Sequence, residues 1–221
     1  MNAEEFFGDW GRVIPFDILK QSLNKLSERM QTESICPSPE LLFEAFKKCN
    51  YNNLKVVFLG QSPYPQKGVA TGLCFANKKD VDKMSPSLQV LYDSVDKYCT
   101  DDLPFSTIDK VFPDLEYWAN QGMLLLNSSL SIKEGDPDSH TEIWRKFIGT
   151  LLQNISKDKP DTIFVLFGEV AKTFICFIEN NNYICTVHPA ACARRGTLLP
   201  NIFAEIDRRM IERNISLIYW I

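Results

Sequence analysis

The residues of this chain that could do chemistry come directly after short apolar runs. The run at 55–60 leads into GQSPYP, the run at 123–127 ends in Asn127, and the run at 183–188 ends in His188. An asparagine amide offers one acceptor and two donors, and a serine such as Ser62 can hydrogen-bond a water molecule while staying neutral. No cluster of metal-ligand residues accompanies them in the sequence. We therefore expect a site that works without a metal or another cofactor.

Short apolar runs alternate with helical patterns along the chain. Four runs are nearly continuous in apolar residues, as is typical of strands covered on both faces: 55–60, 123–127, 162–168 and 183–188. Elsewhere, apolar residues recur every four positions at 143–155, 170–178 and 202–210. This alternation predicts an α/β fold with a central four-stranded parallel sheet and helices on both faces. The length predicts a single domain over residues 1–221. Open parallel sheets bind ligands at the carboxyl ends of their strands, where the polar residues gather.

Composition and charge narrow the class of protein. The formal net charge is −4 at pH 7, so contact with DNA requires a local basic patch. The seven cysteines include no C-x-x-C pair, and several lie in apolar runs, which indicates buried thiols in a reducing, intracellular compartment. The acidic first residues do not resemble a signal peptide, and no apolar stretch approaches the roughly 18 residues that span a membrane. We expect no membrane partner.

Six segments, in this order, resemble the motifs of the uracil-DNA glycosylase family, the main family that removes uracil from DNA: KVVFLGQSPYP, GLCFAN, SPSL, WANQGMLLLNSSLSI, DSH and VHPAACARRG. The resemblance covers most of the chain. It implies a uracil-DNA glycosylase-like fold and a monofunctional enzyme that flips uracil out of single- or double-stranded DNA. Hydrolysis of the N-glycosidic bond would leave an abasic site, as in base excision repair. We expect a monomer whose partner is DNA, and the sequence identifies no protein partner.

The resemblance assigns five residues to the flipped base. Asn127 would accept a hydrogen bond from N3–H and donate one to O4, and His188 would donate to O2 as negative charge builds on the leaving base. Phe75 would stack on the base, Tyr64 would pack against C5 and exclude the thymine methyl group, and the backbone of Gln61 would contact the O2 edge. From the residues alone, a turn-closing asparagine, a structural histidine and a core phenylalanine remain alternatives.

The resemblance also predicts contacts with DNA phosphates. Ser85, Pro86 and Ser87 would bind phosphates through hydroxyl and backbone N–H groups, and His140 would contact another phosphate. Basic residues would supply a local positive field: Lys67, Arg194 and Arg195. A helix N-terminal position for His140 and a solvated surface for the arginines are the alternatives.

Four positions depart from the family's motifs. Ser62 stands where the family has the aspartate that positions the attacking water and places negative charge near the sugar. Cys192 replaces an intercalating leucine, Ala190 replaces a phosphate-binding serine, and Pro65 replaces a histidine. We keep Ala190 and Cys192 among the DNA-facing residues, with weaker flipping because cysteine is a smaller wedge. The PYP and HPAA variants resemble those of the poxviral branch, whose members also serve as polymerase processivity partners.

Three hypotheses follow from Ser62. The first is a uracil-excising enzyme that is slower than typical members, in which His188 carries most of the catalysis. The second is a glycosylase for a modified pyrimidine, for example in defence against DNA with modified bases. The third is a catalytically weak or inactive DNA-binding or processivity scaffold on the same fold.

Overall fold

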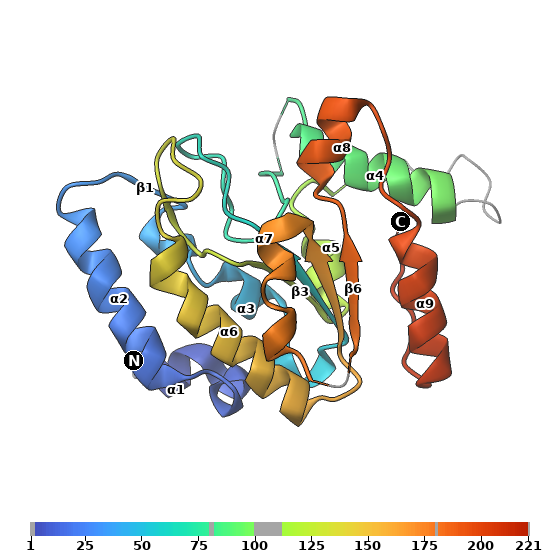
Figure 1. Cartoon of the computed structure of the whole chain (residues 1–221), viewed down its shortest axis with the longest axis horizontal. Helices are drawn as coiled ribbons and strands as arrows, with labels where there is room; N and C mark the ends of the chain where they lie inside the picture. The colour runs from blue at the N-terminus through green and yellow to red at the C-terminus, as the bar shows by residue number, and fades with distance from the viewer. Residues whose placement is uncertain (1–2, 80–81, 100–111, 180, 221) are drawn as a thin grey trace.

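A four-stranded parallel sheet forms the centre of the molecule (Figure 1). The computed structural model describes residues 3–79, 82–99, 112–179 and 181–220. The sheet consists of β2 (Val56–Gly60), β3 (Met123–Asn127), β5 (Ile163–Phe167) and β6 (Tyr183–Thr186). The strands lie in the order β3-β2-β5-β6, and every neighbouring pair is parallel. The predicted α/β fold is therefore confirmed.

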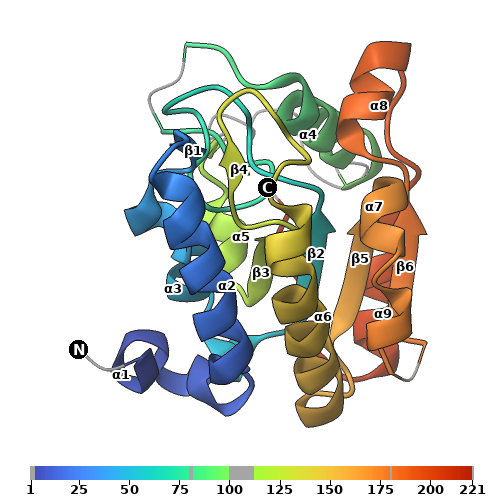
Figure 2. The ribbon, with the colours of Figure 1, turned by 60° about the vertical axis from the view of Figure 1, so that its left-hand side comes forward.

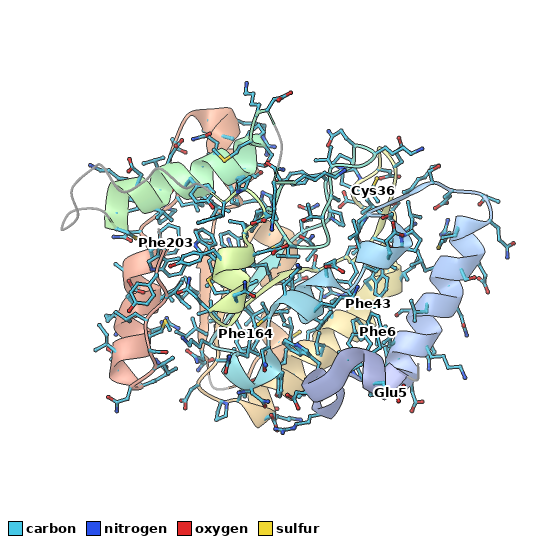
Figure 3. All side chains as sticks on the ribbon, turned by 180° about the vertical axis from the view of Figure 1, so that it is seen from behind. Glu5, Phe6, Cys36, Phe43, Phe164 and Phe203 are labelled. Carbon is cyan, nitrogen blue, oxygen red and sulfur yellow. The ribbon has the colours of Figure 1, made fainter. Side chains whose placement is uncertain are left out.

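Helices cover both faces of the sheet because side chains alternate along each strand. In β2, Val57 and Leu59 enter one core, whereas Val56 and Phe58 enter the other. The long helices divide between the two faces, as Figures 1 and 2 show: α2 (Phe16–Met30) and α6 (Thr141–Asp158) with the first core, α4 (Pro86–Cys99) and α9 (Ile202–Glu212) with the second. Figure 3 labels one phenylalanine from each core, Phe164 and Phe203.

Short elements connect these layers. The short helices are α1 (Ala3–Phe7), α3 (Glu44–Lys48), α5 (Glu116–Asn120), α7 (Gly168–Lys172) and α8 (Pro189–Arg195). The 3-10 turns are η1 (Gly8–Arg12), η2 (Pro39–Leu41), η3 (Tyr51–Asn53) and η5 (Ile175–Phe177). A small antiparallel pair, which the sequence did not reveal, joins β1 (Ile35–Cys36) to β4 (Ile132–Lys133). Within the described ranges, we find no helix with the length and hydropathy of a membrane span.

The helix predicted over 170–178 is broken into two pieces. The α-helix α7 stops at Lys172, and a 3-10 turn begins at Ile175. The Thr173 hydroxyl donates to the Val170 carbonyl, and the Phe174 N–H bonds the Ala171 carbonyl three residues back. These local bonds tighten the last turn and end the α-helix, while Phe174 stays buried.

The carboxyl ends of the strands point to the top of Figure 2, where α4, α8 and several loops meet. At this edge Gly60, the last residue of β2, pairs with Asn127, the last residue of β3. The predicted functional loops therefore leave the sheet side by side.

Candidate active site

A cavity of about 370 Å³ opens at the carboxyl ends of the strands. Its walls come from the loop after β2, the segment 70–75, the end of β3 and the start of α8. It brings together ten of the residues singled out in the sequence: Gln61, Ser62, Tyr64, Pro65, Phe75, Ser87, Asn127, His188, Ala190 and Arg194. Residues far apart in the sequence thus form one site.

The loop after β2 is held through its backbone carbonyls, which accept hydrogen bonds from the segment after β3. The Gln61 carbonyl accepts from the Ser128 hydroxyl at 2.7 Å and from the Ser129 N–H at 3.1 Å. The Pro65 carbonyl accepts from the Gly135 N–H at 3.0 Å. Because the prolines at 63 and 65 also fix φ, the residues between these anchors have little freedom.

Asn127 turns its amide into the cavity. Its side chain is 7% exposed, and the amide makes no hydrogen bond to another residue of the described ranges. A Cβ at Gly60 would lie 2.7 Å from the Asn127 Oδ1, so only glycine at that position leaves the amide in place. A nearly buried amide without protein partners is expected to be satisfied by a ligand.

Tyr64 and Phe75 form the apolar part of the cavity wall. The Tyr64 hydroxyl donates to the Phe75 carbonyl at 2.8 Å and lies 2.5 Å from the Ser85 Oγ. Burial raises the pKa of Tyr64 to about 12, so the phenol is neutral. Phe75 has φ +65°, a left-handed conformation that costs a non-glycine residue about 1 kcal/mol or more. The hydrogen bond from Tyr64 helps to hold that conformation. The Phe75 ring packs edge-on against Phe167, with centroids 5.0 Å apart.

His188 presents one ring nitrogen to the protein and keeps the other for the cavity. Its Nδ1 accepts from the Ala190 N–H at 3.1 Å, which assigns the ring proton to Nε2. Burial, and secondly the positive charge of Arg194, lower the pKa of His188 below its ordinary value. The ring is therefore a neutral donor at pH 7. Gly168 permits this placement because a Cβ there would lie 3.0 Å from the His188 Cβ.

Ser62 is half-buried in the cavity wall, and no carboxylate stands beside it there. None of the described residues that line the cavity is Asp or Glu. The carboxylate that contacts this loop belongs to Asp138, which accepts from the Gln61 Nε2 at 2.9 Å. The site thus offers neutral hydrogen-bonding groups where the family's motif carries a negative charge.

His140 lies in the interior, and its ring does not reach the protein surface. Its side chain is fully buried, with Nδ1 2.9 Å from the Ser131 Oγ and Nε2 3.1 Å from the Glu33 Oε2. The Trp144 Nε1 donates to the same Ser131 hydroxyl at 2.8 Å. Both ring nitrogens are engaged within the protein, so this geometry supports the structural alternative at the start of α6. It offers no ring nitrogen to a phosphate.

Cys192 also points inward. It is 3% exposed and packs in the second core, so its side chain does not project from α8 as an intercalating wedge would. The exposed side chains of the last turn of α8 are those of Arg194 and Arg195. The reason is helical geometry: α8 turns one face to α4 and the core, and position 192 falls on it.

The remaining residues predicted to contact DNA line the cavity or lie within two positions of a residue that does. Pro86, Lys67 and Arg195 are exposed, and Ser87 lies in the cavity wall. Ser85 precedes α4, and its hydroxyl is already engaged by Tyr64. Ala190 donates its N–H to His188, so that group is not free for a phosphate.

Sequence reasoning missed parts of the wall. Ala70, Gly72, Leu73 and Pro137 also line the cavity. Gly72 carries the clearest overlooked signal: its φ is +89°, and a Cβ there would lie 2.1 Å from the Leu41 carbonyl oxygen. No group of three potential metal ligands occurs in the part of the chain that the structure describes.

Comparisons with known proteins agree on one family. The profile described as Uracil DNA glycosylase superfamily matches residues 46–209. A Uracil-DNA glycosylase from Borrelia turicatae is 35% identical over 215 residues, which cover 93% of each protein. A Uracil-DNA glycosylase from Campylobacter fetus is 31% identical, covering 98% of this chain and 88% of its own.

Solved structures show the same fold. The crystal structure of mimivirus uracil-DNA glycosylase aligns with a TM-score of 0.78 at 22% identity, covering 100% of this chain and 93% of the other. The mimivirus Y322L variant in complex with UGI aligns with a TM-score of 0.77 at 24% identity, covering 93% and 86%. At these identities, the likeness establishes the architecture alone.

Proposed function

This chain belongs to the uracil-DNA glycosylase superfamily, and from that premise we propose that it hydrolyses the N-glycosidic bond of uracil in DNA. The observation that carries the proposal is a cavity in which the free amide of Asn127 and the neutral donor of His188 share one wall with Phe75. The cavity of about 370 Å³ lies within the usual range of about 300–1,000 Å³ for small-molecule sites. DNA is its partner, and the flipped base is the part that enters.

Recognition of uracil rests on Asn127. The amide oxygen accepts from N3–H, and the amide nitrogen donates to O4. Cytosine presents an acceptor at N3 and a donor at its amino group, so it meets like groups and leaves buried polar atoms unpaired. Tyr64, fixed through its hydroxyl, packs against C5 and leaves no room for the thymine methyl group.

Cleavage rests on His188. As the C1′–N1 bond breaks, its electron pair stays with the base and negative charge spreads to O2. The Nε2–H donates to that oxygen. Because the donor is neutral and already oriented by the Ala190 N–H, it needs no reorganisation during the step. Removing one such donor typically costs about 10²–10³ in kcat.

Water completes the reaction. Its oxygen bonds to C1′ of the positively charged sugar, it releases one proton, and the base leaves as uracil after taking up a proton. Ser62 accepts from and orients this water but cannot take its proton as a carboxylate would. We infer a slower enzyme, because a positioned general base is typically worth about 10²–10⁴ in rate.

DNA binding rests on the rim of the cavity. Lys67 and Arg195 neutralise phosphates, and Ser87, in the cavity wall at the start of α4, adds a hydroxyl contact. His140 and the side chain of Cys192 have no part in it, since both are buried.

A panel of oligonucleotides tests this proposal. Each carries one uracil, thymine, cytosine or 5-substituted uracil, in single- and double-stranded form, and abasic sites are revealed by alkaline cleavage. We expect cleavage at uracil and none at thymine or cytosine. Efficient cleavage at a substituted pyrimidine with none at uracil favours the altered-specificity hypothesis, and binding without cleavage at enzyme excess favours the scaffold.

A further inference from the structure

Breaking the glycosidic bond separates charge, and this site has an unusual charge distribution for that step. The base becomes negative and the sugar becomes positive. On the sugar side, Ser62 is neutral, and no Asp or Glu is found among the described residues of the wall. On the base side, His188 is a neutral donor. Among the described residues that line the cavity, Arg194 is the one with a formal charge.

Arg194 is placed to act on the base. It lies in the last turn of α8, whose first turn is capped by His188, and both residues line the same cavity. Its charge reaches the imidazole, since it contributes to lowering the His188 pKa. A cation that is felt at the ring of His188 is also felt at the oxygen to which that ring donates.

Arg194 is not committed elsewhere in the described structure. Its guanidinium makes no hydrogen bond or ion pair with another described residue. Several other arginines are held by neighbours in the fold: Arg29 by Glu33, Arg145 by Thr173, Arg208 and Arg209 by Glu205. An uncommitted arginine at the wall of a cavity is free to follow a developing charge.

We propose that Arg194 stabilises the negative charge on the departing base, so that this site is helped by a cation on the base side of the breaking bond. This inference rests on the proposed function and deepens it. The bond broken, the electron pair retained by the base and the water consumed are those described above, so no further reactant is needed. In this protein, the electrostatic help lost at Ser62 is partly replaced from the opposite side of the scissile bond.

The alternative role for Arg194 is contact with a DNA phosphate, and the two roles differ in what they change. A phosphate contact alters affinity and its salt dependence, equally for every base. Stabilisation of the leaving base alters the chemical step, and it matters less for a base that already leaves easily. Fluorine at C5 withdraws electrons and makes 5-fluorouracil such a base.

Single-turnover excision with saturating protein separates these roles. The substrates are single-stranded oligonucleotides with one uracil or one 5-fluorouracil. For Arg194→Gln we expect a uracil rate about 10- to 100-fold lower, the range for one charge roughly 6–12 Å from a developing charge at an effective dielectric constant near 20. The 5-fluorouracil rate should fall less, and Arg194→Lys should recover part of the loss. The acid limb of the pH–rate profile should move to higher pH in Arg194→Gln, because the His188 pKa rises when the neighbouring cation is removed.

Arg195→Gln is the matched control, one residue further along α8 and outside the cavity wall. It should weaken DNA binding and its salt dependence while keeping the wild-type ratio of the two excision rates. The inference is overturned if Arg194→Gln loses affinity alone, or if both bases slow by the same factor with no change in the pH profile. If the wild type releases neither base, the proposed glycosylase function is contradicted, and the inference about Arg194 falls with it. Thermal unfolding of each variant identifies any loss due to misfolding.

Discussion

Replacing Ser62 by aspartate should make this protein a faster enzyme. The hydroxyl lines the cavity and has no hydrogen-bond partner among the described residues, so a longer side chain can reach the water without breaking a contact. A positioned carboxylate base is worth about 10²–10⁴ in rate, or about 3–5 kcal/mol of barrier. The cation of Arg194 in the same wall favours the ionised carboxylate, whereas Asp138, bonded to the adjacent Gln61, opposes it. We therefore expect a gain near the lower end of that range, about 100-fold.

The assay is single-turnover excision from a single-stranded oligonucleotide with one uracil, followed as abasic sites. Ser62→Asn is the control, because its side chain is close to aspartate in size but neutral, and it should bring no comparable gain. The gain of Ser62→Asp should be present at neutral pH and lost as the pH falls through the pKa of the new carboxyl. An unchanged or slower rate for Ser62→Asp at pH 7, with the fold intact, would show that the missing charge at position 62 does not limit this enzyme.

Three further outcomes follow from the geometry. Changing His188 to Ala should lower the single-turnover rate about 10²–10³-fold. In the wild type, the rate should fall only below about pH 6.5, because the pKa of His188 lies under its ordinary value. Protonation lowers the rate because it removes the acceptor that the Ala190 N–H requires. Gly60→Ala should lower the rate of uracil excision at least tenfold, because the new Cβ would lie 2.7 Å from the Asn127 Oδ1 and displace the amide. The control Gly11→Ala, whose Cβ meets nothing closer than 4.0 Å, should leave the rate unchanged. Equal rates for the two variants would show that the Asn127 amide does not recognise the base. His140→Ala should lower the free energy of unfolding in urea by about 2–3 kcal/mol, through loss of its buried hydrogen bonds, and leave the salt dependence of DNA binding unchanged. A weaker salt dependence with unchanged stability would show instead that His140 contacts a DNA phosphate.

The strands β2, β3 and β5 were predictable because they are buried on both faces. The edge strand β6 is less enclosed, with Cys185 exposed. The runs that contain Val56–Gly60 and Ile163–Phe167 are continuously apolar, and a run buried on both sides has few other places in a fold. The position of the site could be predicted from the sheet, because parallel strands bring their carboxyl ends to one edge. Gly60 and Asn127 end neighbouring strands, and the register of these strands places the two residues opposite each other.

Side-chain direction was not predictable in the same way. His140 and Cys192 occupy positions that the family's motifs mark as DNA-facing, yet both side chains turn inward. For His140, the partners are Glu33 and Ser131, one of them 107 positions away, and no local pattern encodes such a contact. For Cys192, the inward direction depends on how α8 packs on α4, which the spacing of its own residues does not reveal.

The sequence also did not predict the requirement for Gly72 or the short pairing of β1 with β4. Gly72 is required because a Cβ at this position would lie 2.1 Å from the carbonyl oxygen of Leu41, which belongs to a segment separate in the sequence. The pairing of Ile35–Cys36 with Ile132–Lys133 involves only two residues on each side, too few to give a strand pattern. Both contacts depend on tertiary packing.

Glycosylase activity is tested most directly by quantifying the free base and the abasic DNA that the wild-type protein produces. Protein in excess is incubated with single-stranded DNA containing one uracil in the presence of EDTA, and released uracil is measured by mass spectrometry beside abasic sites. We expect equal amounts of uracil and abasic sites, formed more slowly than in an enzyme with a catalytic carboxylate but reaching completion. DNA that is bound yet still holds all of its uracil after prolonged incubation would contradict this expectation.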